Sequence, residues 1–165
     1  MRWRKSVIHI ANANPWLCDL FRHPVASAGG FARFRVPTVA ALHDLLLSEV
    51  PQVFPKLRFG FIEASAQWLP WVLHEARNRF RSLKRPWPDN IMAEYRMFVT
   101  CENSDDIGYI THEAGDEALV IGTDYGHTDP SSDIDAIVTF KAREDVTPAL
   151  KRKILTENPT ALYAL

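Results

Sequence analysis

Four short runs of β-branched, aromatic and aliphatic residues are spaced along the chain, and each has the composition of a buried strand. They are VIHIA (7–11), LRFGFIEA (57–64), YRMFVTCE (95–102) and ALVIGTDY (118–125). Each run is almost continuously apolar, without the strict alternation that marks a strand with one wet face. The pattern therefore predicts strands that are covered on both faces, as in a parallel sheet.

Between the first three runs, apolar residues recur at helical spacing. The segment 38–50, TVAALHDLLLSEV, has this spacing, and Thr38 is its predicted N-cap. The segment 68–80, WLPWVLHEARNRF, has an apolar stripe. Its members are Leu69, Val72, Leu73, Ala76 and Phe80. Both segments are predicted to be amphipathic helices that cover the sheet.

Helical signals also follow the third and fourth runs. Ser104 is the predicted cap of a helix that ends at Gly115, and the segment 133–140 is predicted to be helical. Thr147, followed by proline, opens a last helix that is predicted to end at Pro159. Four strands alternating with helices predict an α/β fold with a parallel sheet, in a single domain over residues 1–165.

Composition narrows the possible functions. Lys and Arg number 19 against 20 Asp and Glu, so no global field attracts nucleic acid or an anionic membrane. A basic stretch at 77–86 is expected on the solvated side and end of a helix. No segment approaches the roughly 20 apolar residues of a membrane span. Two cysteines, Cys18 and Cys101, make no disulfide framework, which favours a reducing cytoplasm.

Polar residues interrupt or end all four predicted strands. His9 lies within the first, Glu63 lies in the second, Cys101 and Glu102 lie at the end of the third, and Asp124 lies in the fourth. Parallel α/β folds bind ligands at the carboxyl ends of their strands, so these groups are candidates for metal binding or proton transfer. The alternatives are ordinary wet strand ends, a hydrogen-bonded core histidine at His9, and a small buried hydrophobe at Cys101.

The other histidines are weaker candidates. His43 and His74 fall within predicted helices, where structural or exposed positions are expected, and His112 falls in a last helical turn, where a positive charge suits the helix dipole. His23 lies on the long connection 12–37. Connections of this length are often lids or binding segments, so His23 is a candidate for substrate binding.

Three stretches resemble one known family. LVIGTDYGHTD resembles the last barrel strand of the metal-dependent amidohydrolase superfamily, in the "amidohydrolase 2" branch that contains aminocarboxymuconate-semialdehyde decarboxylase. KRKILTENPTALYAL is similar to the closing helix of that branch, and FPKLRFGFIEASAQWLPWVL is similar to its sixth-strand segment. Gly126 stands where the branch usually has proline.

The resemblance implies a (β/α)8 barrel with a divalent metal, most often zinc, at the carboxyl rim. His9 matches the fifth-strand histidine ligand. Asp124 matches the eighth-strand aspartate, which sits at the metal and handles a proton of the attacking water. His127 matches the histidine that follows it and is expected beside the ligands, toward the substrate. A small carboxylated or cyclic organic substrate is implied by the family.

Two departures limit the resemblance. The sixth strand often ends in a catalytic histidine, whereas this chain has Glu63, which is expected to act as base or ligand. The four strands match only strands five to eight, and no His-x-His pair, the usual first-strand ligands, occurs in the chain. The expected architecture is therefore the C-terminal half of a (β/α)8 TIM barrel.

A half-barrel leaves two sheet edges without a neighbouring strand. It also exposes apolar side chains that face the barrel interior, and Ile8, Phe61 and Val120 are expected to be among them. A complementary N-terminal half-barrel, a second copy in a homo-oligomer, or a truncated product are the possible explanations. The chain is expected to be part of a metal-dependent hydrolase or decarboxylase, or else an inactive remnant or assembly subunit. An independent doubly wound ligand-binding domain is a third possibility, which no Gly-rich phosphate loop supports.

Overall fold

The computed structural model describes residues 4–9, 19, 31–127 and 132–165. Within these ranges one parallel sheet is formed. Its strands are β1 (Arg4–His9), β2 (Leu57–Ile62), β3 (Met97–Cys101) and β4 (Leu119–Ile121). They lie side by side in the order β1-β2-β3-β4, and every neighbouring pair is parallel. The predicted strands and their parallel arrangement are confirmed.

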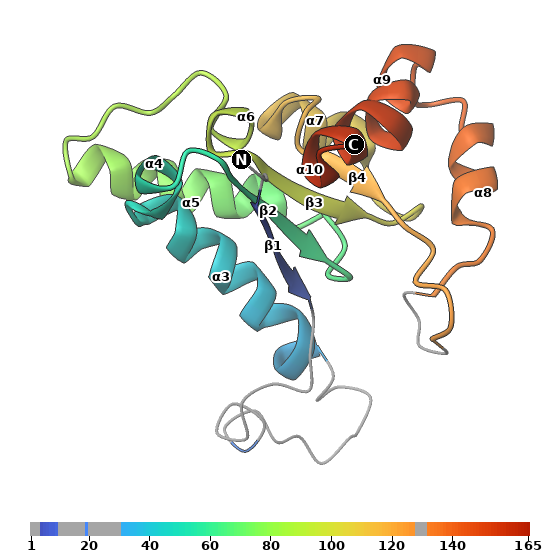
Figure 1. Cartoon of the computed structure of the whole chain (residues 1–165), viewed down its shortest axis with the longest axis horizontal. Coiled ribbons are helices and arrows are strands. Elements are labelled where there is room, and N and C mark those ends of the chain that lie inside the picture. The colour runs from blue at the N-terminus through green and yellow to red at the C-terminus, as the bar shows by residue number, and fades with distance from the viewer. Residues whose placement is uncertain (1–3, 10–18, 20–30, 128–131) are drawn as a thin grey trace.

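Helices follow every strand. In chain order the helical segments are η1 (Phe31–Arg35), α3 (Val36–Leu47), α4 (Val50–Val53), α5 (Leu69–Ser82), α6 (Ile91–Tyr95), α7 (Ile107–Ala114), α8 (Ala136–Ala142), α9 (Pro148–Arg152), η2 (Lys153–Glu157) and α10 (Asn158–Tyr163). Helix α5 packs between α3 and α7, and these three helices cover one face of the sheet (Figure 1). The opposite face is concave and is covered in part by α10.

The main core lies between the sheet and the covering helices. The helix-facing strand residues Phe59, Phe61, Met97, Val99 and Leu119 are almost completely buried there. The expectation that Phe61 and Ile8 face the barrel interior is wrong: Phe61 belongs to this core and Ile8 packs against it. Side chains alternate between the two faces of a strand, so an expectation that is off by one residue reverses the face.

Val120 does lie on the concave face, but it has not lost its cover. Val120, Phe98 and Leu162 form a second, smaller core, in which Leu162 of α10 is completely buried. Gly60 of β2 allows this close approach, since a Cβ at that position would lie 3.2 Å from Cδ2 of Leu162. Helix α10 therefore closes the amino-terminal part of the concave face.

Helix ends follow the predicted signals only in part. The apolar stripe of α5 is buried as predicted, Gly115 is the C-cap of α7, and the Thr147 side chain accepts a hydrogen bond from the Leu150 N–H at the start of α9. Thr38 and Ser104 are not caps: Thr38 is buried within the first turn of α3, and Asp106 caps α7.

The predicted end at Pro159 is also wrong. The chain passes from α9 through the π-helical segment η2 into α10, and Pro159 lies in the first turn of α10. Proline lacks an N–H and clashes with the preceding turn of an α-helix, and the wider π-helical turn in front of it accommodates both effects.

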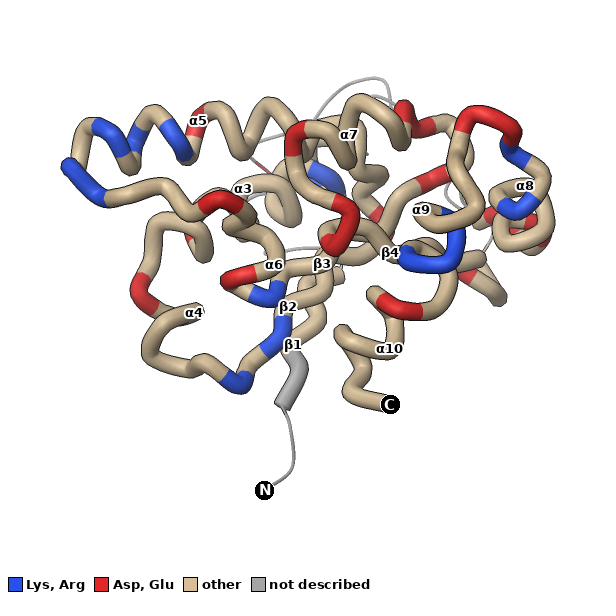
Figure 2. The backbone as a smooth tube through the Cα atoms, turned by 90° about the horizontal axis from the view of Figure 1, so that it is seen from above, with Lys and Arg blue, Asp and Glu red and all other residues tan. Residues whose placement is uncertain are grey.

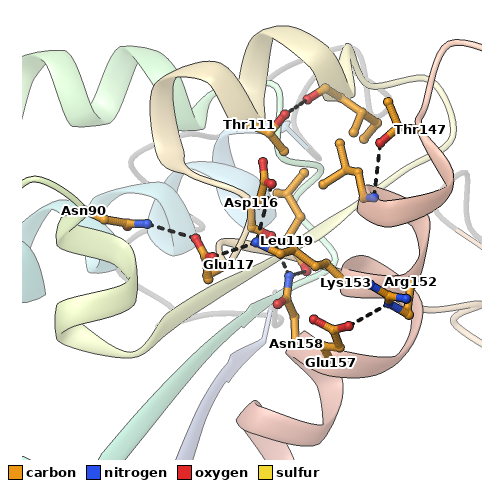
Figure 3. A network of polar contacts seen from close by, with 12 residues as sticks. Asn90, Thr111, Asp116, Glu117, Leu119, Thr147, Arg152, Lys153, Glu157 and Asn158 are labelled. Carbon is orange, nitrogen blue, oxygen red and sulfur yellow. Dashed lines mark hydrogen bonds and ion pairs between the residues drawn. The ribbon is translucent and has the colours of Figure 1, made fainter.

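A network of polar contacts holds this closing segment to the amino end of β4 (Figure 3). Asn158 is buried and donates from Nδ2 to the backbone oxygens of Asp116, at 2.8 Å, and Leu119, at 2.7 Å. Lys153 Nζ lies 2.8 Å from Glu117 Oε1, and Asn90 donates to the other Glu117 oxygen at 3.0 Å.

Charges are dispersed over the surface (Figure 2). The basic stretch lies on the exposed side and end of α5 as predicted, with Arg77, Arg79, Arg81 and Lys84 exposed. Among the described helices, none is long and apolar enough to span a membrane.

Candidate metal centre

The carboxyl ends of the four strands carry the polar side chains that the sequence singles out. His9 is the last residue of β1, Glu63 and Glu102 directly follow β2 and β3, and Asp124 lies shortly after β4. Since the strands are parallel, these ends meet at one edge of the sheet. The structure thus brings His9, Glu63 and Asp124 together at the carboxyl rim, as the sequence predicts.

The rim contains two buried carboxylates, each paired with a more exposed histidine. His9 Nε2 lies 2.5 Å from Glu63 Oε1, and His127 Nδ1 lies 2.8 Å from Asp124 Oδ1. The carboxylate side chains are each only 9% exposed, whereas the histidines are 44% and 55% exposed, respectively. Ligand atoms of Glu63, Asp124 and His127 all lie within 4.8 Å of one another, close enough to share one cation.

The two carboxylates perturb each other. Burial raises the pKa of Glu63 above its ordinary value, and the neighbouring Asp124 carboxyl raises this pKa further, against the opposing effect of His9. One Asp124 oxygen, Oδ2, is buried and has no hydrogen-bond partner in the part of the chain that the structure describes. A buried acceptor without a donor is costly unless a cation or a proton occupies the space beside it.

The backbone at both carboxylates is left-handed. Glu63 has φ 65° and Asp124 has φ 49°, a region that few residues other than Gly adopt and in which Asp is tolerated better than Glu. Backbone strain of this kind clusters at functional sites, where neighbouring structure holds it. Gly126, which replaces the proline usual in the family, has φ 97°. Proline is locked near −65°, so this turn follows a path that the usual residue would not allow.

A cavity of about 300 Å³ opens at the rim beside these groups. It is lined by Ile62, Glu63, Ser65, Thr100, Cys101, Glu102, Asn103, Ser104, Ile121, Gly122, Asp124, Asp133 and Ala136. Its size is at the lower end of the range typical of small-molecule sites. The residues around it come from the loops that follow β2, β3 and β4.

The two residues singled out at the end of β3 differ in their surroundings. Cys101 is buried, and burial raises its pKa to about 12, so the thiol stays protonated and unreactive at neutral pH. Glu102 Oε1 accepts a hydrogen bond from Arg35 at 3.2 Å. The end of β3 therefore contributes an ion pair with Arg35 rather than a nucleophile.

Sequence reasoning missed the residues that tie the rim loops together. Asp105 is buried and bonds to Ser65, Ala66 and Glu102, and Asn103 bonds to Asp133. The consecutive acids at 105–106 suggested only the first turn of a helix. A buried position for the first of them is not visible in the local pattern, because both acids look equally solvated.

The remaining histidines lie away from the rim cluster. His74 and His112 are exposed on α5 and in the last turn of α7, as predicted, and His43 is partly buried within α3. The candidate substrate residue His23 lies outside the described residues, and so does Cys18.

The donor set at the rim fits a divalent cation. Imidazole nitrogens and carboxylate oxygens are the usual ligands of zinc and related ions. The buried, unpaired Asp124 Oδ2 is the atom that a cation would satisfy, with Glu63 and His127 within reach of the same point and His9 in contact with Glu63. Of the two metal ligands proposed from the sequence, this group contains Asp124, together with Glu63 and His127, whereas His9 lies outside the group and contacts Glu63.

Comparison with solved structures places the fold among barrel enzymes. The chain is similar to an amidohydrolase from Mycobacterium avium subsp. paratuberculosis K-10, with a TM-score of 0.71, 15% identity, and coverage of 98% of this chain and 42% of that one. It is also similar to 5-carboxyvanillate decarboxylase from Sphingomonas paucimobilis, with a TM-score of 0.62, 16% identity, and coverage of 96% and 49%. For a candidate amidohydrolase from Staphylococcus aureus the TM-score is 0.70 and the identity 17%, with coverage of 98% and 54%.

The chain therefore spans about half the length of these structures, and its four-stranded parallel sheet matches part of their (β/α)8 barrel. The predicted fold, strands five to eight of such a barrel, is confirmed. No match is found among curated proteins. The family model Amidohydro_2, described as Amidohydrolase, matches residues 7–165, which is almost the whole chain, and the protein belongs to this amidohydrolase family.

Proposed function

We propose that this chain forms part of a metal-dependent hydrolase or decarboxylase that acts on a small carboxylated or cyclic organic compound. The family is generally metal-dependent, and one structural neighbour is named a decarboxylase of 5-carboxyvanillate. The observation that carries the proposal is the buried Asp124 Oδ2, which has no hydrogen-bond partner among the described residues and lies next to Glu63 and His127.

In this proposal His9 and Asp124 are metal ligands, with zinc as the preferred ion, and Glu63 is either a further ligand or the base. When bound, the cation polarises the substrate and lowers the pKa of a water molecule. Asp124 would hold the cation through Oδ2, since His127 Nδ1 contacts its Oδ1, and the Asp124 carboxylate would also be the group that takes up a proton from a water molecule at the site. In the absence of a cation, burial and the neighbouring Asp124 carboxyl raise the pKa of Glu63, so the charged form of Glu63 is costly.

His127 has the role of a positioning and substrate-facing residue. Its Nδ1 contacts Asp124, and its side chain is more than half exposed, so the rest of the ring is free to meet a substrate at the rim. His23, which lies outside the described residues, stays a proposed substrate-binding residue.

The complete site needs further ligands and a closed barrel. Structural zinc sites have about four protein ligands, and catalytic zinc sites have about three protein ligands and a water molecule. In this proposal His9 and Asp124 supply two of the protein ligands. We propose that a complementary N-terminal half-barrel or a second copy of this chain pairs with the edges of β1 and β4, in a cytoplasmic setting. Light scattering that finds a stable monomer with a sharp cooperative melt would contradict this.

Calorimetric titration with zinc tests the metal site directly. We expect weak one-to-one binding to the isolated chain, with a Kd of about 1 μM or weaker, equivalent to about 8 kcal/mol. Asp124→Asn should abolish it, while Asp89→Asn, a change at an exposed carboxylate far along the chain from the rim, should leave it intact. Absence of zinc binding, or equal binding by both variants, would refute the proposal.

A further inference from the structure

Asp105 lies just after β3 and is the centre of a hydrogen-bonded clamp between two rim loops. Its side chain accepts a hydrogen bond from Ser65 Oγ at 2.6 Å, from the Ala66 N–H at 2.9 Å and from the Glu102 N–H at 2.8 Å. The residue is only 4% exposed. A buried carboxylate is tolerated only with such a set of donors, and here every donor belongs to a loop that carries a rim residue.

The loop after β2 needs this support because its backbone is strained. Glu63 and Ser65 both have left-handed conformations, with φ values of 65° and 60°. Conformations of this kind persist when surrounding contacts fix them. Ser65 and Ala66 both donate to Asp105, two and three residues after Glu63, so the clamp fixes the turn that places Glu63 beside His9 and Asp124.

The clamp also continues toward the loop after β4. Arg143 donates to the backbone oxygens of Asn103, at 2.9 Å, and Asp105, at 3.1 Å, and holds the β3 loop against the end of α8. Asn103 Nδ2 lies 3.2 Å from Asp133 Oδ2, and the Asp133 N–H donates to the Thr123 oxygen at 3.1 Å. A chain of hydrogen bonds thus joins the loop of Glu63 to the loop of Asp124.

We propose that Asp105 is a positioning residue for the rim cluster: it contacts neither a cation nor a substrate, but sets the distance between the Glu63 and Asp124 carboxylates. The metal-binding part of this inference rests on the proposed function. The positioning part rests on the clamp alone and has its own measurement.

The test compares four forms of the full chain: wild type, Asp105→Ala, Asp105→Asn and Asp106→Ala. Alanine at 105 leaves two backbone N–H groups and Ser65 without their acceptor. Asp105→Asn should preserve the clamp, since the asparagine oxygen still accepts hydrogen bonds from the Ala66 and Glu102 N–H groups and its NH₂ group donates to Ser65 Oγ. Asp106→Ala is a destabilising control, because it removes the cap that accepts from Tyr109 but leaves the clamp intact.

Cobalt(II) titration, followed by visible absorption, is the first measurement. Loss of a group that orients metal ligands typically costs 10–100-fold in affinity, so we expect Asp105→Ala to weaken cobalt binding by about that factor and to change the cobalt spectrum. Asp105→Asn and Asp106→Ala should bind like the wild type. Equal affinity and spectrum for Asp105→Ala and wild type, or equal losses in Asp105→Ala and Asp106→Ala, would overturn the proposal.

The second measurement needs no metal. The ¹⁵N chemical shift of His9 Nε2 reports its contact with Glu63, and we expect Asp105→Ala to change it while Asp105→Asn and Asp106→Ala preserve it. If wild type binds no cobalt, the proposed function fails and this shift alone decides the role of Asp105. If Asp105→Ala does not fold, Ser65→Ala, which removes one hydrogen bond, should alter the His9 shift in the same direction, and an unchanged shift would overturn the inference.

Discussion

The carboxylates Glu117 and Glu63, at opposite ends of the parallel sheet, have pKa values shifted in opposite directions. At the amino end of β4, Glu117 is bonded by Lys153 and Asn90, and these hydrogen bonds lower its pKa (Figure 3). At the carboxyl end, Glu63 is more deeply buried beside Asp124, and its pKa is raised. One carboxylate is stabilised in its charged form, and the other is held where charge is costly unless a cation is present.

The two ends also differ in how their polar groups are satisfied. The amino end has a buried asparagine with both donors occupied and a leucine that fills the concave face. The carboxyl end has an Asp124 oxygen, Oδ2, without a hydrogen bond among the described residues. In (β/α)8 barrels generally, the carboxyl end carries catalysis and the amino end carries stability.

The largest expected effect on stability is at the amino end, from Leu162→Ala. Leu162 is completely buried between β2, β3 and β4, so its truncation opens a cavity and should reduce the free energy of unfolding by about 2–5 kcal/mol. Leu165→Ala is the control, since Leu165 is 90% exposed. Chemical denaturation measures both. A loss below about 1 kcal/mol for Leu162→Ala would show that α10 does not pack on the concave face.

Asn158→Ala should have the next largest effect. It leaves the backbone oxygens of Asp116 and Leu119 buried without a donor, which costs about 1–3 kcal/mol. Thr160→Ala, at an exposed position on the same helix, should change stability by less than about 0.5 kcal/mol. Thermal melts of both variants test the pair, and similar melting temperatures would mean that the Asn158 contacts do not anchor the closing segment.

Asp124→Asn should increase the free energy of unfolding, which Leu162→Ala and Asn158→Ala decrease. It should also abolish zinc binding. Asparagine tolerates the left-handed backbone better than most residues, and its amide donates to the Glu63 carboxyl where a carboxylate repels it. We expect a gain of about 0.5–1 kcal/mol in the free energy of unfolding without metal, as is common when a strained functional residue is replaced. A clear loss of stability would indicate that Asp124 has a structural role instead.

Only part of the difference between the two ends of the sheet can be predicted from the sequence. Continuous apolar runs identify the four strands, and the stripe from Leu69 to Phe80 identifies the buried face of α5, because both patterns are local. Asp124 is found because a carboxylate at the end of a strand, followed by His127, is unusual and resembles a family motif. The roles of these residues stay predictions.

What the sequence does not reveal depends on contacts between distant segments. Asp105 and Asp106 are adjacent acids, yet one is buried beneath the β2 loop and the other caps α7. Leu162 looks like any apolar residue of a last helix, and only its approach to Gly60 reveals that it covers the concave face. The face assigned to Phe61 was wrong because periodicity alone does not fix which side of a doubly covered strand meets the helices.

The smallest expected effect concerns pH, and it tests Glu117 at the amino end, whose pKa is lowered, whereas the pKa of Glu63 at the rim is raised. The pKa of Glu117 lies below its ordinary value of 4.5 in the folded chain, chiefly because of the hydrogen bond from Lys153. The stabilisation is therefore fully present above the pKa of the unfolded chain and is lost as the pH falls through the lower, folded value. Because both partners are partly exposed, the effect is modest.

Melting temperatures of wild type should thus fall more steeply than those of Glu117→Gln as the pH drops below about 4.5. Glu113→Gln is the matched control, since Glu113 is an exposed carboxylate of α7 that pairs with the exposed His112. Parallel pH profiles for wild type and Glu117→Gln would mean that the Lys153 pair does not persist in solution.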